Sequence, residues 1–262
     1  MLPLPCKILY GLFMLKSERQ QLILKEVEQR NRVQLQDLVQ RLDVSIDTVR
    51  RDVKELDAEH KLRKVHGGAV SLGFASFSPQ RNSIYALDEK TAIAEKAVGL
   101  VSEGQVIFID GGTTCLELAR SLPPELELKC FTHSIPVALE LLQKPRYTVE
   151  FIGGTLSPES HLAQGISAVR QLAELHLDMA FIGTGYVDAE HGLSESVWET
   201  AQMKKSLIEA ARKTVLLCIS EKVNSQHRFR SSTLDQISAL ITEKDPHENI
   251  LKAFQKLPLE II

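Results

Sequence analysis

The sequence predicts an α/β protein of two domains: an N-terminal, helix-rich winged helix-turn-helix domain followed by a mostly parallel α/β domain. Short amphipathic helices and then a basic, alternating stretch occupy residues 14–70. Strand-like and helix-like segments alternate from residue 88 to the end, which is typical of a parallel sheet covered by helices on both faces. The 262 residues, 44% hydrophobic and 25% charged, supply enough apolar material for a globular core.

The first 13 residues differ from the rest of the chain. They are apolar, contain Pro3 and Pro5 and have no helical cap, whereas a helical pattern begins at Met14. We therefore interpret residues 1–13 as a non-native or disordered extension and expect Met14 to be the biological start. A signal peptide is the alternative, but Lys7 lies inside the apolar stretch and no small-residue cleavage site follows.

Two short amphipathic helices are predicted at the start of the first domain. One begins at Ser17, and Asn31 can take the left-handed conformation that ends a helix. The other covers residues 36–42 and is followed by a turn at Asp43-Val44. The side chains that we expect to face inward are Leu22, Ile23, Val27, Leu35, Leu38 and Leu42.

A third helix is predicted from Ser45, which can cap it, to about His60. Apolar residues recur along it at intervals of three and four, so they form its buried seam. The seam consists of Ile46, Val49, Val53 and Leu56. By subtraction, the outer face carries Asp47, Thr48, Arg50, Arg51 and Lys54.

A basic, alternating stretch at 62–70 turns at Gly67-Gly68 and predicts a β wing beside the third helix. Two helices joined by a tight turn and followed by a wing are typical of a domain that inserts its second helix into the DNA major groove. The side chains that we expect to contact DNA are Ser45, Asp47, Thr48, Arg50, Arg51 and Lys54 on the helix and Arg63, Lys64 and His66 on the wing. The two helix arginines suit guanine edges, and the wing cations suit phosphates.

The charges alone leave an alternative open. Residues 14–70 carry twelve Lys or Arg against ten Asp or Glu, which is only a small basic excess. The outer helix face is equally compatible with a solvated surface on which Asp47, Asp52 and Glu55 neutralise the cations.

Residues 71–87 lack periodicity and are predicted to be a linker, followed by a second domain over residues 88–262. Its expected helices cover residues 88–101, 115–121, 135–142, 165–174, 199–212 and 247–256. Its expected strands cover residues 106–110, 128–132, 149–152, 179–183, 215–219, 239–242 and 259–262. Ligands of such sheets bind beyond the carboxyl ends of the strands.

Three of the predicted strands end in small, donor-rich turns. Glycines allow tight turns there, and Thr and Ser offer hydroxyl and N–H donors at the following helix, which together can cradle a phosphate. Two lysines of the later segments would supply positive charge. The candidate ligand-binding residues are Asp110, Gly111, Gly112, Thr113, Thr114, Thr132, His133, Ser134, Gly153, Gly154, Lys204 and Lys222. Ordinary turn and cap chemistry, with solvated lysines, is the alternative for these residues.

Two strings, S-x-x-T-V-R-R-D-V from Ser45 and L-R-K-V-H-G-G-A from Leu62, resemble the DNA-binding domain of the DeoR family of bacterial sugar-metabolism regulators. The segments I-D-G-G-T-T, F-T-H-S, F-I-G-G-T-L and L-D-M-A-F-I-G-T-G are similar to the family's sensor domain. The resemblance covers residues 14–262. It implies a sensor fold like that of ribose-5-phosphate isomerase and the coenzyme A transferases, with a phosphorylated sugar as effector and no cofactor.

The sequence departs from the family pattern at three positions. His133 stands where the family usually has Asn, Ile219 where it usually has Asp, and Gln202 where an acidic residue is common. We interpret His133 as a donor that replaces the amide; the alternative is a pH-sensitive site, because histidine titrates near neutral pH.

Three functions are compatible with these features: a transcription regulator, a sugar-phosphate isomerase or transferase-like enzyme with a DNA-binding appendage, and a nonspecific DNA binder. Carboxylates are available at Asp110, Glu195 and Glu199, but no catalytic or metal-binding motif accompanies them, so we expect neither a catalytic nor a metal site. A nonspecific binder would leave the strand-end turns unexplained. We therefore expect a cytoplasmic regulator, most simply a repressor, without a membrane segment, that binds a double-stranded operator and a sugar phosphate as a homo-oligomer, a dimer or tetramer.

Overall fold

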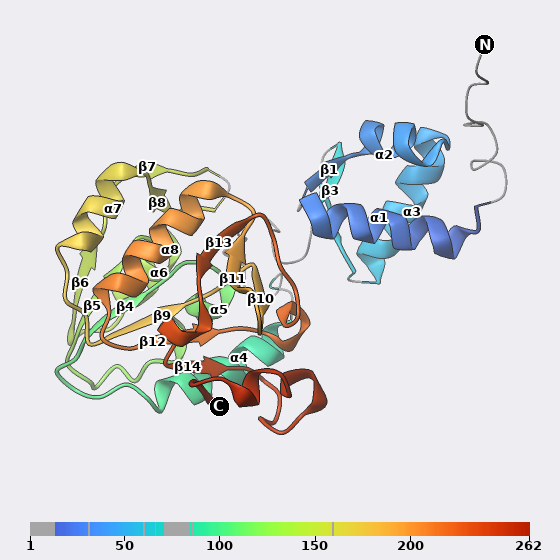
Figure 1. The fold of residues 1–262 in the computed structure, drawn as a ribbon. Helices are drawn as coiled ribbons and strands as arrows, with labels where there is room; N and C mark the ends of the chain where they lie inside the picture. The colour runs from blue at the N-terminus through green and yellow to red at the C-terminus, as the bar shows by residue number, and fades with distance from the viewer. Residues whose placement is uncertain are drawn as a thin grey trace, which may run out of the picture. The chain divides into compact units, whose positions relative to one another are not determined.

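The computed structural model describes residues 14–30, 32–59, 61–65, 67–70, 84, 86–158 and 160–262. The chain divides into two compact units, residues 1–75 and 76–262. The predictions for residues 1–13, for Asn31 and for nearly all of the linker fall outside the described residues. Each unit is described by itself (Figure 1).

The first unit contains three helices and a small antiparallel sheet. The helices are α1 (Lys16–Arg30), α2 (Leu35–Leu42) and α3 (Ile46–Ala58). The strands are β1 (Arg32–Gln34), β2 (Arg63–Val65) and β3 (Gly68–Val70), in the order β1-β3-β2. Asp43 ends α2 in the left-handed conformation, and the Ser45 side chain caps α3 by accepting a hydrogen bond from the Thr48 N–H at 3.2 Å. These elements are a helix-turn-helix followed by a wing.

A single apolar core joins the three helices to the wing. It contains the inward-facing residues predicted for α2 and most of those predicted for α3. The prediction was wrong for Leu22, which is 39% exposed, because Ile23 and Val27 already fill the side of α1 that meets α3. A Cβ atom at Gly68 would collide with the carbonyl oxygen of Val33, so the strand pairing of β1 with β3 requires glycine there.

The second unit is built on a seven-stranded parallel sheet, as the alternation of segments predicted. The strand order is β15-β14-β12-β9-β4-β5-β6. The strands are β4 (Val106–Ile109), β5 (Leu128–Thr132), β6 (Tyr147–Phe151), β9 (Met179–Ile182), β12 (Thr214–Leu217), β14 (Ala239–Ile241) and β15 (Glu260–Ile261). The order changes direction between β4 and β9, and such a switch point is where ligands bind in open parallel sheets.

Helices cover both faces of this sheet (Figure 1). One face packs against α4 (Leu87–Val98), α5 (Thr113–Ser121) and α6 (Ile135–Leu141), and the other against α7 (Ile166–Ala173) and α8 (Trp198–Ala210). Within β4, Ile107 and Ile109 join the first core and Phe108 joins the second. Both faces of the central strands are thus dry, which explains their continuous apolar runs.

Two small antiparallel sheets and several 3₁₀ turns were not predicted. One sheet pairs β7 (Thr155–Leu156) with β8 (Ala163–Gln164), and the other joins β10 (Tyr186–Asp188), β11 (Gly192–Glu195) and β13 (Phe229–Ser232). The 3₁₀ turns cover Ser220–Lys222, Leu234–Gln236, Asn249–Leu251 and Phe254–Lys256. The last two replace the helix predicted over residues 247–256, where only Leu251 and Phe254 are buried in the turns and Pro246 and Pro258 flank the segment.

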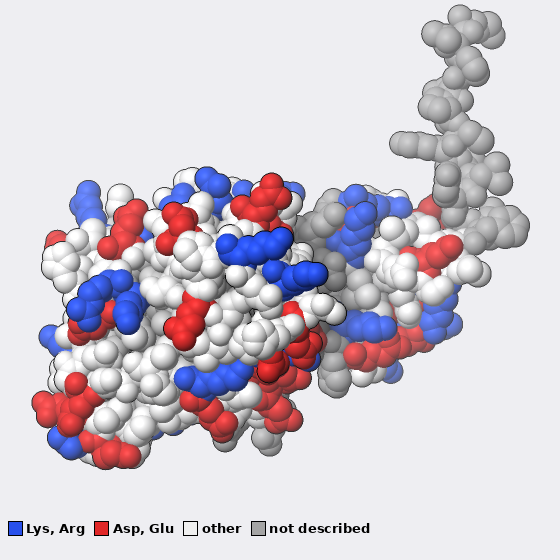
Figure 2. All heavy atoms as spheres, turned by 60° about the horizontal axis from the view of Figure 1, so that its bottom comes forward, with Lys and Arg blue, Asp and Glu red and all other residues white. Residues whose placement is uncertain are grey.

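Charges of both signs are interspersed on the face of the molecule shown in Figure 2. This face therefore presents no large field of one sign to a partner. Within the part of the chain that the structure describes, no helix is long and apolar enough to cross a bilayer. The same residues contain no cluster of His, Cys, Asp or Glu that could hold a metal ion.

Candidate effector site and nucleic-acid interface

The outer face of α3 presents the side chains that were predicted to contact DNA. Arg50, Arg51 and Lys54 are exposed, and Thr48 is half-buried beside the capping hydroxyl of Ser45, 2.9 Å away. Arg50 donates a hydrogen bond to Asp47 at 3.1 Å. Such an exposed pair contributes about 0.2–0.5 kcal/mol, less than the roughly 1–3 kcal/mol of a bidentate guanine contact, so it does not prevent Arg50 from reaching DNA.

Two of the three carboxylates that could have neutralised this face turn toward α1 instead. Asp52 is 1% exposed and accepts two hydrogen bonds from the guanidinium of Arg19, at 2.5 and 3.1 Å. Glu55 forms a 2.6 Å ion pair with Lys16 and accepts a 2.8 Å hydrogen bond from Gln20. Asp52 is thus withdrawn from the outer face, whereas Glu55 still neutralises part of it: the bond from Lys16, and further the charge of Arg51, lower the pKa of Glu55. The alternative of a solvated, charge-neutral face therefore keeps Asp47 and, in part, Glu55.

The wing is tied to α3 through its backbone. The N–H of Lys64 donates to the carboxylate of Asp57 at 2.9 Å, which leaves the Lys64 side chain exposed. Gly67 turns the wing with a φ of 74°. Arg63 is half-buried, and His66 lies outside the described residues.

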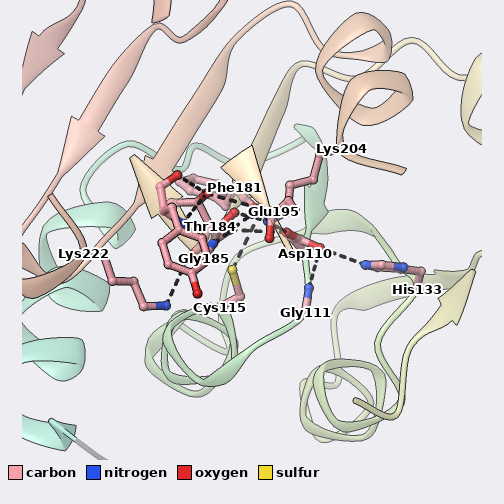
Figure 3. Close-up of polar contacts among 12 residues, drawn as sticks. Asp110, Gly111, Cys115, His133, Phe181, Thr184, Gly185, Glu195, Lys204 and Lys222 are labelled. Carbon is pink, nitrogen blue, oxygen red and sulfur yellow. Dashed lines mark hydrogen bonds and ion pairs between the residues drawn. The ribbon is translucent and has the colours of Figure 1, made fainter. Parts of the chain in front are cut away.

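The second unit brings together turns that follow neighbouring strands at the switch point of the sheet. Asp110 follows β4, His133 follows β5 and Gly183 follows β9. Figure 3 shows these turns around Asp110, with Lys204 and Glu195 beside them. The sequence predicted the first two turns, whereas the turn after β9 enters because β9 lies next to β4 in the sheet.

Asp110 is the centre of this cluster and is 5% exposed. Its Oδ1 accepts hydrogen bonds from the Gly111 N–H at 2.7 Å and from Nε2 of His133 at 2.8 Å. Its Oδ2 accepts from Nζ of Lys204 and the Gly183 N–H, both at 3.3 Å. Burial alone would raise the pKa of this carboxyl, but the charge of Lys204 and the bond from His133 outweigh it and hold the pKa well below its usual range.

Lys204 is buried between two carboxylates. It lies 3.1 Å from Oε1 of Glu195 and 3.3 Å from Asp110, and it also donates to the carbonyl oxygen of Gly183. Burial lowers the pKa of the ammonium, but the two carboxylates outweigh burial and raise it. Glu195 in turn accepts from the Thr184 hydroxyl at 3.2 Å. The Lys204 ammonium is therefore buried among two carboxylates and a backbone carbonyl, and its predicted role in ligand binding stays a prediction.

The first turn of α5 supplies donors next to Asp110. Gly112 has a φ of 94° and is exposed, and the first hydrogen bond within the helix is donated by the Leu116 N–H to the Gly112 carbonyl. The N–H groups of Thr113 and Thr114 therefore have no partner within the helix. An anion at this helix end would meet these N–H groups and the positive end of the helix dipole.

Other predicted ligand residues have partners of their own. Thr132 is fully buried and its hydroxyl accepts from the Ser134 N–H at 3.1 Å, while Ser134 caps α6. Both backbone groups of Gly153 bond to the side chain of Gln171, at 3.3 and 3.0 Å, and Gly154 packs against β8. The structure thus gives these turns a supporting role around His133 and α7.

Lys222 and Lys90 add positive charge at the same edge of the sheet. Lys222 is half-buried and donates to the Thr184 carbonyl at 2.9 Å. Lys90, near the start of α4, is 6% exposed; burial, and then the charge of Lys222, lowers its pKa to about 8. Sequence analysis missed Lys90, although a lysine within the apolar face of a helix was a visible signal, and it assigned Glu195 no binding role.

Comparisons with known proteins match both units. Residues 19–73 match the DeoR-like helix-turn-helix domain, and residues 86–244 match the DeoR C terminal sensor domain. YulB of Bacillus subtilis strain 168, an uncharacterized HTH-type transcriptional regulator, is 32% identical over 250 residues, which cover 95% of this chain and 96% of that protein. The glycerol-3-phosphate regulon repressor of Haemophilus influenzae is 31% identical over 235 residues, which cover 89% of this chain and 91% of that protein.

A solved structure that matches part of this chain is ribose 5-phosphate isomerase A from Methanocaldococcus jannaschii. The match has 22% sequence identity and a TM-score of 0.38, and it covers 52% of this chain and 53% of that chain. The relatives named above are transcriptional regulators, and the two domain matches occur here in one chain. The chain therefore belongs to the DeoR family, as a DNA-binding transcription regulator and not an enzyme.

Proposed function

We propose that this protein is a repressor of a sugar-metabolism operon and that a phosphorylated sugar weakens its binding to DNA. The observation that carries the proposal is the position of the Asp110–Thr114 turn at the switch point between β4 and β9. This turn presents the N-terminus of α5 beside the buried cluster of Asp110, His133 and Lys204. The name of the glycerol-3-phosphate regulon repressor supports the same ligand class.

The phosphate group would bind at the N-terminus of α5. The N–H groups of Thr113 and Thr114 point out of the first turn, and Lys222 and Lys90 supply charge at the same edge. Burial, and then the charge of Lys222, lowers the pKa of Lys90 to about 8, so an anion bound nearby would favour its charged form. The sugar would then lie toward Asp110, whose carboxylate positions His133 and Lys204.

The DNA half of the proposal rests on α3 and the wing. Arg50 and Arg51 would read base edges from the exposed face of α3, and Lys64 would contact phosphates. Because a symmetric operator presents two half-sites, we propose that the protein binds it as a homo-oligomer, a dimer or tetramer, in the cytoplasm. No cofactor is part of this proposal.

The effector controls DNA binding only if it prefers one arrangement of the protein. A ligand with equal affinity for the DNA-bound and free arrangements shifts nothing, so the sugar phosphate must bind the low-affinity arrangement more tightly. For a tenfold loss of operator affinity, the effector's binding free energy must differ by about 1.4 kcal/mol between the two arrangements of the protein.

Fluorescence anisotropy tests both halves of the proposal. The full-length protein is titrated onto DNA from upstream of its own gene and onto random DNA, at one fixed salt concentration, with and without a panel of sugar phosphates. We expect one sugar phosphate to weaken operator binding by at least about tenfold, a response that Lys222→Met removes and that the exposed-surface control Lys252→Met retains. Operator binding that no phosphorylated sugar alters would overturn the effector half, and equal affinity for both DNAs would overturn the regulator half.

A further inference from the structure

His133 makes two side-chain hydrogen bonds, and both of its partners are acceptors. Its Nδ1 lies 2.8 Å from the carbonyl oxygen of Ala163, and its Nε2 lies 2.8 Å from Oδ1 of Asp110. The residue is 4% exposed, so water cannot replace either partner. A neutral imidazole has one N–H donor and one lone pair, whereas an imidazolium has two donors. Only the charged ring can donate to both acceptors at once.

Asp110 does not supply the missing proton. Its Oδ1 already accepts the Gly111 N–H at 2.7 Å, and its Oδ2 accepts from Gly183 and Lys204. Burial opposes ionisation of the carboxyl, but the charge of Lys204 and the two backbone N–H donors, none of which depends on His133, favour the ionised form. The carboxyl is therefore ionised, and the proton shared by this pair belongs to His133.

The backbone of His133 holds the same residue that its ring contacts. The Ala163 N–H donates to the carbonyl oxygen of His133 at 2.8 Å, and the Ile135 N–H donates to that of His161 at 3.1 Å. Between these bonds, Ser134 and Leu162 pair as an isolated antiparallel bridge. His133 thus bonds to both backbone groups of Ala163. Its carbonyl oxygen accepts from the Ala163 N–H, and its ring contacts the Ala163 carbonyl oxygen.

Residues 160–164, which contain Ala163, lie over the ligand-binding turn. We call them the covering segment. A Cβ atom at Gly111 would collide with the side chain of Leu162, which shows that the covering segment lies directly on the turn after Asp110. The backbone of His161 in this segment has a φ of 55°, a conformation that residues other than glycine seldom adopt. The position of the segment therefore depends on contacts such as the one from His133.

The groups in direct contact with the ring and with its carboxylate partner favour a protonated ring. Asp110 faces Nε2 from the end of β4, Lys204 faces Asp110 from α8, and Glu195 of β11 contacts the other side of Lys204. Lys222 lies farther out, where it donates to the carbonyl of Thr184. Cys115 of α5 lies near Asp110 as a neutral thiol, because burial raises its pKa, and His161 is the titratable residue of the covering segment. Among the directly bonded groups, one ammonium and one imidazolium match the two carboxylates.

We propose that His133 is a positioning residue held as an imidazolium, and that its proton ties the covering segment to the ligand-binding turn. Loss of this proton leaves the lone pair of one ring nitrogen facing an acceptor. Because a bond to a carboxylate is stronger than one to a carbonyl, the remaining proton stays on Nε2 and the bond to Ala163 is lost. The covering segment is then held by backbone bonds alone, and the cluster becomes negative. Its second consequence rests on the proposed function: an anionic effector binds more weakly once His133 is neutral.

The protonation state is measured directly on the ligand-free protein. Full-length protein labelled with ¹⁵N-histidine is examined by NMR at pH 7, and the His133 ring is assigned by its loss in His133→Asn. We expect two protonated ring nitrogens for His133. One protonated and one unprotonated nitrogen would overturn the proposal, whatever the effector binding shows.

The coupling to the covering segment is measured by amide hydrogen exchange between pH 6 and pH 9, expressed as protection relative to an unfolded chain. We expect the protection of the Ala163 N–H to fall by about tenfold or more as the ring loses its proton, in proportion to the lost bond. His133→Asn should remove this pH dependence. His191→Asn, which alters an exposed histidine bonded to Asp188 at 2.9 Å, should keep it.

Protection that does not change with pH in the native protein, or that changes equally in His133→Asn, would overturn the coupling. The effector titration is run on the same two proteins at pH 6.5 and 8.5. If effector affinity falls more between pH 6.5 and 8.5 in the native protein than in His133→Asn, the second consequence is supported, because the ligand's own ionisation is the same for the two proteins. Equal losses would overturn that consequence, while absence of any binding would refute the proposed function and leave the NMR result standing.

Discussion

The ammonium of Lys204 lies 3.3 Å from the carboxylate of Asp110, although 94 positions separate the two residues in the sequence. The pair is buried at the switch point of the sheet, and Glu195 contacts the same ammonium. The positive charge of Lys204 offsets the cost of burying both carboxylates. This relationship makes the floor of the ligand site part of the fold of the second unit.

Replacing Lys204 by Met should therefore destabilise the second unit by about 3–5 kcal/mol, because two buried carboxylates lose their counter-charge. Urea unfolding followed by circular dichroism measures the change. Lys205→Met is the matched control: Lys205 is half-buried, lies 5.7 Å from the ring centroid of Trp198, and should cost less than about 1 kcal/mol. Adding Glu195→Gln to Lys204→Met should restore part of the loss; an unchanged or larger loss would contradict the charge argument.

Asp110→Asn should reduce stability at pH 7 and much less at low pH. The pKa of Asp110 is lower in the folded protein than in the unfolded chain, so its contribution is complete above the unfolded value, about 4, and is lost as pH falls below it. The difference in unfolding free energy between the native protein and the variant should therefore shrink between pH 5 and pH 2. Chemical denaturation at several pH values measures it, and a constant difference would show that the carboxylate's charge is not what stabilises the fold.

Binding of a sugar phosphate at pH 8 should be coupled to proton uptake by Lys90. Burial and Lys222 lower the pKa of Lys90 to about 8, so the ammonium is partly deprotonated there, and a bound anion raises the pKa again. Without ligand, stability should rise with pH from about 8 to the ordinary lysine value, because the unfolded chain binds the proton more tightly. Calorimetric titration in buffers of different ionisation enthalpy detects the uptake. The signal should decrease in Lys90→Met, and any uptake that remains there belongs to His133; a binding enthalpy independent of buffer in the native protein would refute the prediction.

Arg51→Ala and Lys64→Ala should affect DNA binding in different ways. Loss of a guanine contact costs about 1–3 kcal/mol on the operator and little on random DNA, whereas loss of a phosphate contact weakens both DNAs alike and reduces the salt dependence. Anisotropy on both DNAs over a salt series separates the two. An Arg51 variant that loses equal affinity for operator and random DNA would remove this arginine from base recognition.

Arg19→Ala should destabilise the first unit by about 3–5 kcal/mol because Asp52, 1% exposed, loses both of its hydrogen-bond donors. Lys16→Ala breaks the exposed pair with Glu55 and should cost less than about 1 kcal/mol. Thermal unfolding of the full-length variants, followed through the transition of the helical first unit, compares them. Equal effects of the two substitutions would mean that burial does not strengthen the Arg19–Asp52 contact.

The sequence by itself determined the features that depend on neighbours a few positions away. The cap at Ser45, the turn at Asp43 and the apolar seam of α3 follow from helix periodicity and from side chains that bond their own backbone. The alternation of segments likewise determined a parallel sheet, because parallel strands need crossover helices. Short segments of the sequence resemble the DeoR family, and this resemblance indicated the function.

The tertiary structure decided which of these local features meet. The strand order places β9 beside β4, so Gly183 and Glu195 join the turn at Asp110, and no spacing in the sequence encodes that neighbour. Packing also turned Asp52 of α3 toward Arg19, although periodicity left it among the surface charges. A charged side chain pairs with whichever oppositely charged group the fold brings within a few ångströms. Long-range packing of the helices and the sheet decides which group that is.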